Sequence, residues 1–190
     1  MYFSSDISGD RDDAVLVRQA REGDTDAFGA LATRYQHVMY TAALRMLGDA
    51  EDARDVTQDA FVKAYRQLAT FDANFKFFSW MYRIVINECF NLIRARRAQE
   101  PIDVEVAATG TPFESALAGE RHAHIEAALQ RLSPEYRSVV VLRHFSGQSY
   151  SEIATALSIP EKTVKSRLFT ARQLLGEMLL GWREHAREIE

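Results

Sequence analysis

Residues 150–172 read YSEIATALSIPEKTVKSRLFTAR, and this stretch decides the fold of the C-terminal part of the chain. Tyr150, Ile153 and Leu157 recur at helical spacing, which places them on one side of an α-helix. Pro160 cannot continue that helix but suits the first turn of a second one. The sequence therefore predicts a helix-turn-helix.

The second of these helices has an apolar side and an outward polar side. Its expected buried positions recur at helical spacing and are Val164, Leu168, Ala171 and Leu175. Phe169 points away from this stripe, between cations and a hydroxyl, which fits contact with a thymine methyl group while the cations meet phosphates or base acceptors. A merely solvated charged face is the alternative, and the outward aromatic residue counts against it.

The composition describes a globular protein whose overall charge does not indicate nucleic-acid binding. The chain has 190 residues, 47% of them hydrophobic, and a formal net charge of −4, which allows one domain or two small ones with buried cores. Residues 161–174 nevertheless carry four basic residues against the single acid Glu161. A local basic helix on an acidic protein favours selective docking on DNA over indiscriminate coating.

Several classes of protein are disfavoured by the sequence. Cys89 is the only cysteine, so no intrachain disulfide can form, and the five histidines show no zinc-ligand spacing with it. We therefore expect no metal and no cofactor. Residues 1–13 lack the apolar core of a signal peptide, and no apolar run has membrane-spanning length, so we expect a cytoplasmic protein without membrane insertion. No nucleophile–base pair or glycine-rich phosphate loop indicates an enzyme.

Helical periodicity recurs along the chain and strand signals are almost absent, which predicts an all-α protein. A first helix over about 12–21 is expected to stop at Gly23, and a long second helix, capped by Asp24 or Thr25, is expected to end at Gly48. The predicted buried stripe of the long helix consists of Phe28, Leu31, Tyr35, Val38, Ala42 and Met46.

The next predicted helix, over about 50–68, has two distinct faces. Its core-facing positions are Val56, Ala60, Ala64 and Leu68. Asp52, Asp55 and Asp59 line another side, where stacked like charges repel by a few tenths of a kcal/mol per pair. Such a row is tolerated on a solvated surface or serves to dock a basic partner, and the pattern alone does not choose between the two.

A loop rich in aromatic residues is expected over 71–79, followed by a helix over about 80–97. The helix has an apolar stripe formed by Met81, Val85, Cys89 and Leu92. A different side carries Trp80, Arg83, Asn87, Asn91 and Arg94. Amides and guanidinium groups beside exposed aromatic rings suit the capture of unstacked bases. In the alternative interpretation Trp80 belongs to the core and the asparagines only face water.

The helical pattern breaks over 98–119, which is acidic, contains Pro101, Gly110 and Pro112, and is typical of a flexible linker. We therefore predict two small helical domains, over 1–97 and 120–190. Helices resume with Ile125, Leu129 and Leu132 at helical spacing, and Ser133 is a plausible cap for a helix that runs through Phe145.

Together these motifs resemble the extracytoplasmic-function (ECF) sigma factors, the smallest members of the bacterial sigma-70 family. Residues 49–65, DAEDARDVTQDAFVKAY, are similar to the polymerase-binding helix of region 2, and residues 78–87, FSWMYRIVIN, to its promoter-melting segment. Similarity to region 4 lies in LSPEYR (132–137), YSEIA (150–154) and TVKSRL (163–168). The match covers about residues 14–178, and the order and spacing of the motifs make it highly specific.

The resemblance implies a non-catalytic subunit that makes core RNA polymerase promoter-specific. It implies docking on the clamp of the largest subunit through Asp52, Asp55, Gln58 and Asp59, which decides the role of the acidic row. It implies binding of the melted minus-ten strand by Lys63, Phe71, Asn74, Lys76, Trp80, Asn87, Asn91 and Arg94. It implies reading of the minus-thirty-five element by Lys162, Thr163, Lys165, Ser166, Arg167, Phe169 and Thr170.

The resemblance also implies contact with the flap of the second-largest polymerase subunit, a linker that threads toward the active-site cleft, and an anti-sigma factor as a further partner. The chain departs from the family at Asp72-Ala73, where Arg-Gly is frequent, and at Thr170, where many relatives are basic. An ordinary helix-turn-helix regulator is the competing interpretation. Residues 49–97 discriminate between the two, since a simple regulator does not need them.

Overall fold

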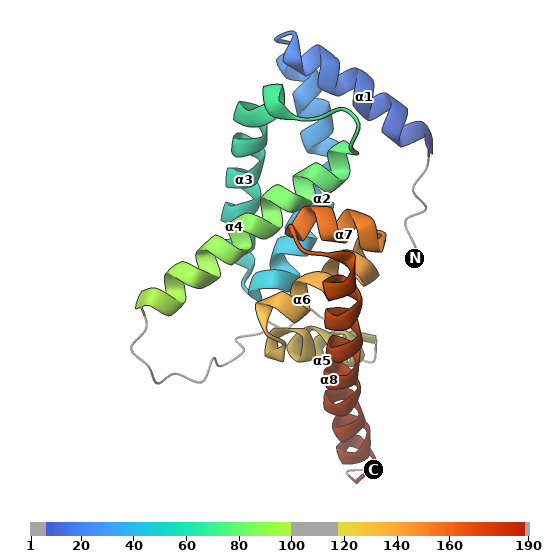
Figure 1. Ribbon diagram of the computed structural model, residues 1–190. Helices are drawn as coiled ribbons and strands as arrows, with labels where there is room; N and C mark the ends of the chain where they lie inside the picture. The colour runs from blue at the N-terminus through green and yellow to red at the C-terminus, as the bar shows by residue number, and fades with distance from the viewer. Residues whose placement is uncertain (1–6, 100–117, 189–190) are drawn as a thin grey trace.

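The computed structural model describes residues 7–99 and 118–188, and within them every regular element is helical (Figure 1). The all-α prediction is confirmed. The first group of helices contains α1 (Ile7–Arg21), α2 (Thr25–Leu47), α3 (Ala50–Gln67), the 3₁₀ turn η1 (Leu68–Thr70) and α4 (Phe77–Gln99). The second group contains α5 (Ala118–Arg131), α6 (Pro134–Val140), the π-helical turn η2 (Val141–Phe145), α7 (Tyr150–Leu157) and α8 (Glu161–Glu188).

The boundaries of α2 follow from its local sequence, as predicted. The Asp24 carboxylate caps the helix by accepting hydrogen bonds from the backbone N–H groups of Asp26 and Ala27 at 2.9 and 3.1 Å. Gly48 ends it with a φ of 76°, a left-handed conformation that favours glycine. The Asp49 side chain then caps α3, so the two helices form a tight antiparallel pair.

The first core lies between α2, α3 and α4. Fully buried side chains from all three helices fill it: Leu31, Met39, Ala43, Met46, Ala53, Ala60, Ala64, Met81, Val85 and Ile86. Most of the predicted stripe of α2 belongs to this core, whereas Tyr35 and Val38 are only partly buried. Small residues on α3 let the helices approach closely, which explains its alanine-rich inner face.

Helix α4 begins at Phe77, three residues before the predicted start. Phe77 lies four residues before Met81 and is buried, so the apolar stripe of α4 extends one turn further back. The rings of Phe77 and Phe78 pack against Tyr35 of α2, with centroids 5.9 and 5.4 Å away. Aromatic packing across the core thus converts part of the predicted loop into helix. Of the predicted linker, 98–99 belong to α4, 118–119 belong to α5, and 100–117 lie outside the described residues.

The second group differs from the prediction in the segment 134–145. Ser133 precedes α6 as expected, but its side chain makes no capping hydrogen bond to the helix. The helix does not continue to Phe145 as a regular α-helix. It widens into η2, where the backbone N–H of Ser146 bonds to the carbonyl of Val141, five residues earlier. Ile125 is 39% exposed, whereas Leu129 and Leu132 are buried as predicted.

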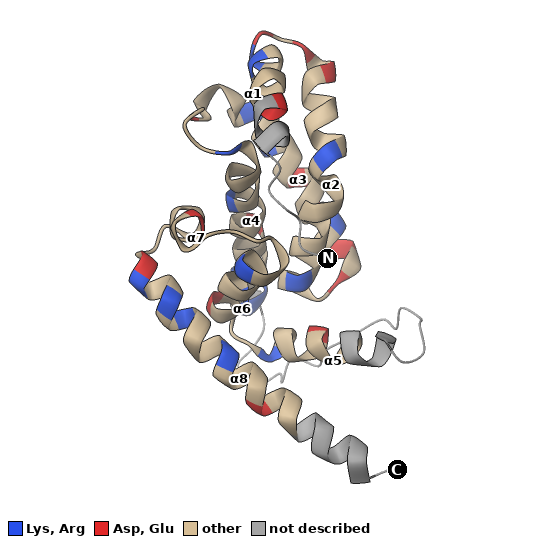
Figure 2. Cartoon of the chain, turned by 90° about the vertical axis from the view of Figure 1, so that its right-hand side faces the viewer, with Lys and Arg blue, Asp and Glu red and all other residues tan. Residues whose placement is uncertain are grey.

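The two groups of helices pack against each other. Helix α7 crosses α4, and α2 contacts α5, α6 and η2 (Figure 1). The buried residues of both groups form one continuous hydrophobic cluster. Helix α8 extends beyond the rest of the second group toward the C-terminus (Figure 2).

Candidate nucleic-acid and polymerase interface

The helix-turn-helix formed by α7 and α8 is built from strong local signals. Ser149 and Glu152 form a reciprocal capping box at the start of α7. Ser158 ends α7 in a left-handed conformation with a φ of 54°, and the carbonyl of Pro160 accepts hydrogen bonds from the first turn of α8. Val164, whose side chain is fully buried, then fixes the rotation of α8 against the domain.

The outward side of α8 is exposed along its first turns. Lys162, Lys165 and Ser166 are exposed, and Phe169 shows 64% of its surface to solvent. Lys and Arg residues follow one another along this part of α8 (Figure 2). The opposite stripe is buried as predicted at Val164, Leu168 and Ala171, whereas Leu175 is only partly buried. An exposed ring of this size on a cationic helix is suited to apolar contact with a base in the major groove.

The remaining predicted readers on α8 are less accessible. Thr163, Arg167 and Thr170 are half-buried at the edge of the face. The ammonium group of Lys165 lies 3.9 Å from the Glu161 carboxylate and 5.6 Å from the centre of the Tyr150 ring. These contacts hold Lys165 beside the first residues of α7 and α8, Tyr150 and Glu161.

On α4 the predicted strand-binding residues form a connected row. Lys63 of α3 pairs with the Glu88 carboxylate at 2.5 Å, and the Asn91 amide donates to the same carboxylate at 3.3 Å. The Arg94 guanidinium donates in turn to the Asn91 side-chain oxygen at 2.7 Å. Asn87 is exposed beside this row. The row offers amide and cationic groups, but most of them are engaged with one another in this conformation.

The loop before α4 divides its aromatic residues between the core and solvent. Phe71 is buried, and the Trp80 ring packs 5.1 Å from it, so a direct contact of Phe71 with DNA is not compatible with this structure. Phe71 instead packs its ring against the rings of Phe77 and Trp80 at the start of α4. Trp80 is only partly covered, between the two alternatives that the sequence left open. Phe75, 54% exposed, is the loop's free aromatic surface, and the aromatic spacing alone did not single it out.

The outer part of this loop is shaped by an Asx turn. The Asp72 carboxylate accepts hydrogen bonds from the backbone and side-chain N–H groups of Asn74, each at 2.9 Å. The next residue but one, Lys76, lies 3.9 Å from the Glu152 carboxylate of α7.

The acidic row on α3 is not uniform. Asp52 forms an ion pair with Arg96 of α4 at 2.6 Å and is largely covered. Asp55, Gln58 and Asp59 are exposed. A partner therefore meets Asp55 and Asp59 first, because the charge of Asp52 is already compensated within the protein.

Sequence reasoning missed the contribution of α2 to this surface. A cavity of about 540 Å³ lies between α2 and α3, and Gln58 is one of its lining residues. Its walls are formed by Ala32, Gln36, His37, Tyr40, Arg54, Thr57, Phe61 and Val62. Tyr40, which is half-buried, and Val62, which is exposed, contribute apolar surface to it. The sequence signal that could have indicated this contribution of α2 is the spacing of Gln36 and Tyr40, which lie four residues apart on one side of the helix.

Within the described residues, no group of histidine, cysteine and carboxylate side chains could hold a metal ion. Cys89 is fully buried, and burial raises the pKa of its thiol to about 12, so it stays protonated and unreactive. In the same part of the chain, no helix combines the length and apolarity needed to cross a membrane.

Known proteins identify the family. The family model described as Sigma-70 region 2 matches residues 31–99, and the one described as Sigma-70, region 4 matches residues 122–175. The ECF RNA polymerase sigma-E factor of Escherichia coli is 34% identical, over 86% of this chain and 92% of the relative. The chain belongs to the ECF sigma factors of the sigma-70 family. The match over 31–99 decides against a simple helix-turn-helix regulator.

Further relatives support the same assignment. The RNA polymerase sigma-H factor of Pseudomonas aeruginosa is 36% identical, over 88% of this sigma factor and 93% of the relative. SigW, an ECF RNA polymerase sigma factor of Bacillus subtilis, is 33% identical, over 86% and 94% of the two chains. The protein is therefore an RNA polymerase sigma factor, which binds core RNA polymerase and directs promoter recognition.

Two solved structures share the arrangement of helices. CnrH, solved in complex with the cytosolic domain of CnrY, matches with a TM-score of 0.71 and 31% identity, over 90% of this sigma factor and 98% of that chain. The sigma factor RpoE of Bartonella quintana, solved with the anti-sigma factor NepR, matches in fold with a TM-score of 0.67 and 24% identity, over 80% and 96% of the two chains. The first superposition spans both helical groups of the sigma factor.

Proposed function

We propose that three separate faces of this sigma factor divide the work of initiation among polymerase docking, strand capture and duplex reading. One observation supports this most: α3 and α8 expose faces of opposite charge on the two helical groups. Asp55 and Asp59 are exposed on α3, and Lys162 and Lys165 on α8. An acidic face suits a basic protein partner, and a basic face suits DNA.

The acidic face of α3 docks on the clamp of the largest polymerase subunit. Asp55, Gln58 and Asp59 provide the polar contacts, and the neighbouring apolar cavity between α2 and α3 receives a side chain of the partner. Asp52 contributes through its ion pair with Arg96, which holds α3 and α4 together beneath the face. The region 4 domain, over 120–190, contacts the flap of the second-largest subunit.

The outer side of α4 and the preceding loop capture the melted non-template strand of the minus-ten element. Asn87, Asn91, Arg94 and Lys63 offer hydrogen-bond and phosphate contacts, with Asn74 and Lys76 at the loop. Phe75 offers a ring on which an unstacked base can stack, which is worth about 1–3 kcal/mol per base. The region 2 domain, over 1–97, therefore handles single-stranded DNA.

The outer side of α8 reads the duplex minus-thirty-five element. Phe169 and Ser166 meet base edges, while Lys162 and Lys165 meet phosphates. The sigma factor itself catalyses no reaction and acts in the cytoplasm together with polymerase. An anti-sigma factor is its expected inhibitor, in line with the complex of the related-fold RpoE with NepR.

Reconstituted transcription tests this function. The purified protein is added to core RNA polymerase with a fragmented genomic library, and run-off transcripts are sequenced. We expect transcripts that start at a common pair of promoter elements and that are absent with core enzyme alone. A matched variant with Ser166→Ala and Phe169→Ala should retain core binding but lose this promoter selection. Transcripts without a shared upstream element in the presence of the parent protein would refute the proposal.

A further inference from the structure

The loop over 71–76, which joins η1 to α4 and which we call the strand-capture loop, is held at its start by the last residue of α1. The Arg21 guanidinium donates hydrogen bonds to the backbone carbonyls of Leu68 and Ala69 at 2.9 and 3.1 Å. It also donates to the carbonyl of Phe71 and lies 5.9 Å from the centre of the Phe71 ring. One charged side chain of α1 therefore binds three carbonyl groups at the end of η1 and the start of the loop.

An arginine is suited to this position because its planar guanidinium presents several N–H donors in a fixed arrangement. The Nε atom of Arg21 donates to Leu68, and one terminal nitrogen donates to both Ala69 and Phe71. A lysine at this place would keep the positive charge, but its compact ammonium group on a flexible stem lacks the fixed fork. The contact thus depends on the shape of the side chain as well as on its charge.

The other end of the strand-capture loop is linked to α1 through Tyr35 of α2. The Asp13 carboxylate of α1 is buried, pairs with Arg34 at 2.5 Å and accepts a hydrogen bond from the Tyr35 hydroxyl. The Tyr35 ring packs against the rings of Phe77 and Phe78, at the start of α4. Burial, and then the hydrogen bond to Asp13, raises the pKa of Tyr35, so its hydroxyl remains a proton donor at neutral pH.

Between these two contacts, the loop exposes the groups that we assign to the melted strand. Asn74, Phe75 and Lys76 are exposed, whereas Phe71 and Phe77 at the two ends are buried. Helix α1 contacts both η1 and α4, and Figure 1 shows it beside the segment that joins them. A loop that is ordered before the ligand arrives loses less conformational entropy on binding, and therefore binds more tightly.

We propose that α1 holds the strand-capture loop in the conformation that receives the minus-ten strand, and that Arg21 and Asp13 are positioning residues for this recognition. Neither residue contacts the strand. Arg21 fixes the start of the loop, and Asp13 fixes the start of α4 through Tyr35. Loss of either contact widens the range of loop conformations, so that Phe75 meets an unstacked base less often. This role rests on the strand-capture function proposed above for the loop.

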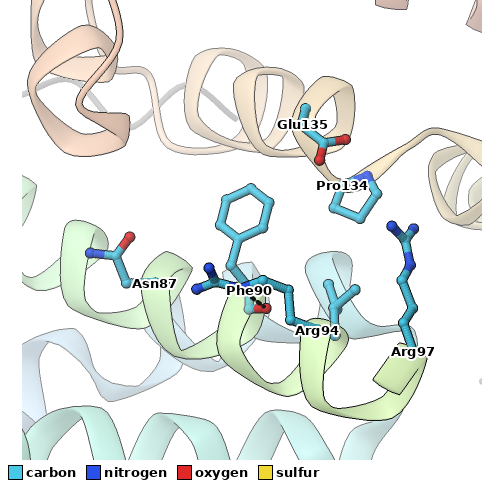
Figure 3. A pocket seen from close by; sticks show the side chains of 7 residues that line it. Asn87, Phe90, Arg94, Arg97, Pro134 and Glu135 are labelled. Atoms are coloured by element: carbon cyan, nitrogen blue, oxygen red, sulfur yellow. Dashed lines mark hydrogen bonds between the residues drawn. The ribbon is translucent and has the colours of Figure 1, made fainter. Parts of the chain in front are cut away.

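The strand-binding residues further along α4 give an internal comparison. Asn87 and Arg94 line an open pocket whose walls come from α4 and from the start of α6 (Figure 3). Asn87 follows Phe77 by ten residues, which is about 15 Å along a helix. Loosening of the loop should therefore leave Asn87 in place, and variants of Arg21 and of Asn87 should affect contacts with different bases.

Substitutions in α1 test the positioning role. Arg21→Gln removes both the charge and the fork, whereas Arg21→Lys keeps the charge. Arg18→Gln, at a second exposed arginine of the same helical turn, is the matched control, and neither arginine belongs to the buried core. Asp13→Asn removes the charge at the other contact with little change in size. Each variant is assayed as holoenzyme with a labelled pool of short single-stranded DNA of randomised sequence, and the bound strands are sequenced.

We expect both Arg21 variants to bind the pool at least about fivefold more weakly than the parent, because affinity falls with the fraction of molecules whose loop is ordered. Enrichment should be lost at the base that the loop contacts and kept at the base that Asn87 contacts. Asp13→Asn should show the same pattern, and Arg18→Gln should match the parent. The slope of log affinity against log salt should not change, because no phosphate contact is lost.

Two binding results would overturn the positioning role. One is parent-like binding by both Arg21 variants. The other is parent-like binding by Arg21→Lys together with a smaller salt slope for Arg21→Gln, which would show that Arg21 binds a phosphate directly.

The fluorescence of Trp80 reports the order of the loop without DNA. Trp182, the second tryptophan of the chain, is replaced by Phe in every protein compared. The Trp80 ring lies 5.1 Å from the Phe71 ring and 5.7 Å from the Phe77 ring, so loosening of the loop exposes it further. Quenching by acrylamide should increase for both Arg21 variants and not for Arg18→Gln. Unchanged quenching in the Arg21 variants would overturn the positioning role.

A further arm separates the positioning role from strand capture itself. Phe75→Ala removes the exposed ring of the loop, and Asn87→Ala removes the amide on α4. If both holoenzymes bound the pool like the parent, strand capture would be refuted and the positioning role with it. If Phe75→Ala weakened binding while the Arg21 variants bound and quenched like the parent, strand capture would stand and the positioning role alone would be refuted.

Discussion

The two DNA-binding faces of this sigma factor differ in their exposure and in the internal contacts of their cations. The face on α8 projects into solvent, with Phe169 64% exposed and its helix fixed by the buried residues behind it. The face on α4 is bounded by α6, and its cations are paired internally, as in Lys63 with Glu88 and Arg94 with Asn91. The cations on α4 are thus held by close hydrogen bonds within the protein, whereas Lys165 on α8 has a looser contact with Glu161, at 3.9 Å.

The difference corresponds to the two forms of DNA that we assign to them. Duplex DNA keeps one shape, so a rigid exposed helix can read it without rearrangement. Single-stranded DNA exists at a promoter only after melting, and cations that are already paired bind stray nucleic acid less well. The internal pairs on α4 therefore favour capture after docking, when polymerase supplies the melted strand.

The largest expected effect tests whether both faces depend on a common docking step. Reversal of Asp55 and Asp59 to Lys should weaken binding to core polymerase by several kcal/mol, because like charges would meet at the interface. Both DNA-binding activities of the holoenzyme should then fall together. Co-elution with core enzyme measures the loss, and a variant with Asp12→Lys and Glu22→Lys, at exposed positions of α1 and the following turn, is the matched control. Unchanged co-elution of the folded double variant would contradict the docking role.

The next prediction isolates the face on α4. Asn87→Ala should weaken open-complex formation by about 1–3 kcal/mol, the range expected for loss of one base contact. Permanganate footprinting of a promoter duplex measures the opening, and binding to the duplex minus-thirty-five element should be unaffected. Gln67→Ala, at the exposed end of α3, is the control. If the Asn87→Ala holoenzyme opened duplex promoters as well as the parent, the assignment of this face would be wrong.

A third prediction isolates the face on α8. Phe169→Ala and Ser166→Ala should each change discrimination among minus-thirty-five sequences by about 1–3 kcal/mol at the base that is contacted. Selection from randomised minus-thirty-five sequences with parent and variant holoenzymes measures the change. Glu177→Gln, on the same helix beyond the recognition turns, should leave the selected sequence unchanged. Identical preferences for all variants would mean that the face positions α8 without reading bases.

The smallest effect concerns the cations of α8. Lys165→Ala should weaken binding at all promoters alike and reduce the slope of log affinity against log salt by about one. Lys165 also contacts Glu161 and Tyr150, and these contacts must break before the side chain can bind a phosphate. The net free energy that the phosphate contact contributes is therefore small. Promoter binding at several salt concentrations measures the slope. A change in sequence preference instead of slope would show that Lys165 contacts a base.

Much of this protein could be predicted from local sequence. The start and end of α2, the capping residue of α7 and the turn at Pro160 depend on backbone groups within a few residues of the side chain that satisfies them. The buried stripes of α3 and α8 follow from the period of the helix. For the same reason the outward positions Asp55 and Asp59 on α3 and Lys162, Lys165, Ser166 and Phe169 on α8 are exposed as the helical period predicts. Packing against other elements partly covers Asp52, Thr163, Arg167 and Thr170.

Whether an individual aromatic residue is buried or exposed could not be predicted in this way. Phe71, Phe75 and Phe77 lie close together in sequence, yet only Phe75 is exposed. Phe71 and Phe77 are buried against each other, with ring centroids 5.9 Å apart, and Phe77 also packs on Tyr35 of α2. Their burial depends on a helix more than thirty residues away, which no local period reports.

The sequence by itself determined the helices, their polar and apolar sides, and the family to which the chain belongs. Only the tertiary structure decided which of the charged groups are free. Asp52 is compensated by Arg96, Lys63 by Glu88, and Arg137 is buried among carbonyl groups at the ends of α2 and α5. The physical reason is that periodicity and capping are properties of neighbouring residues, whereas the pairing of charges depends on side chains that meet only when distant helices pack.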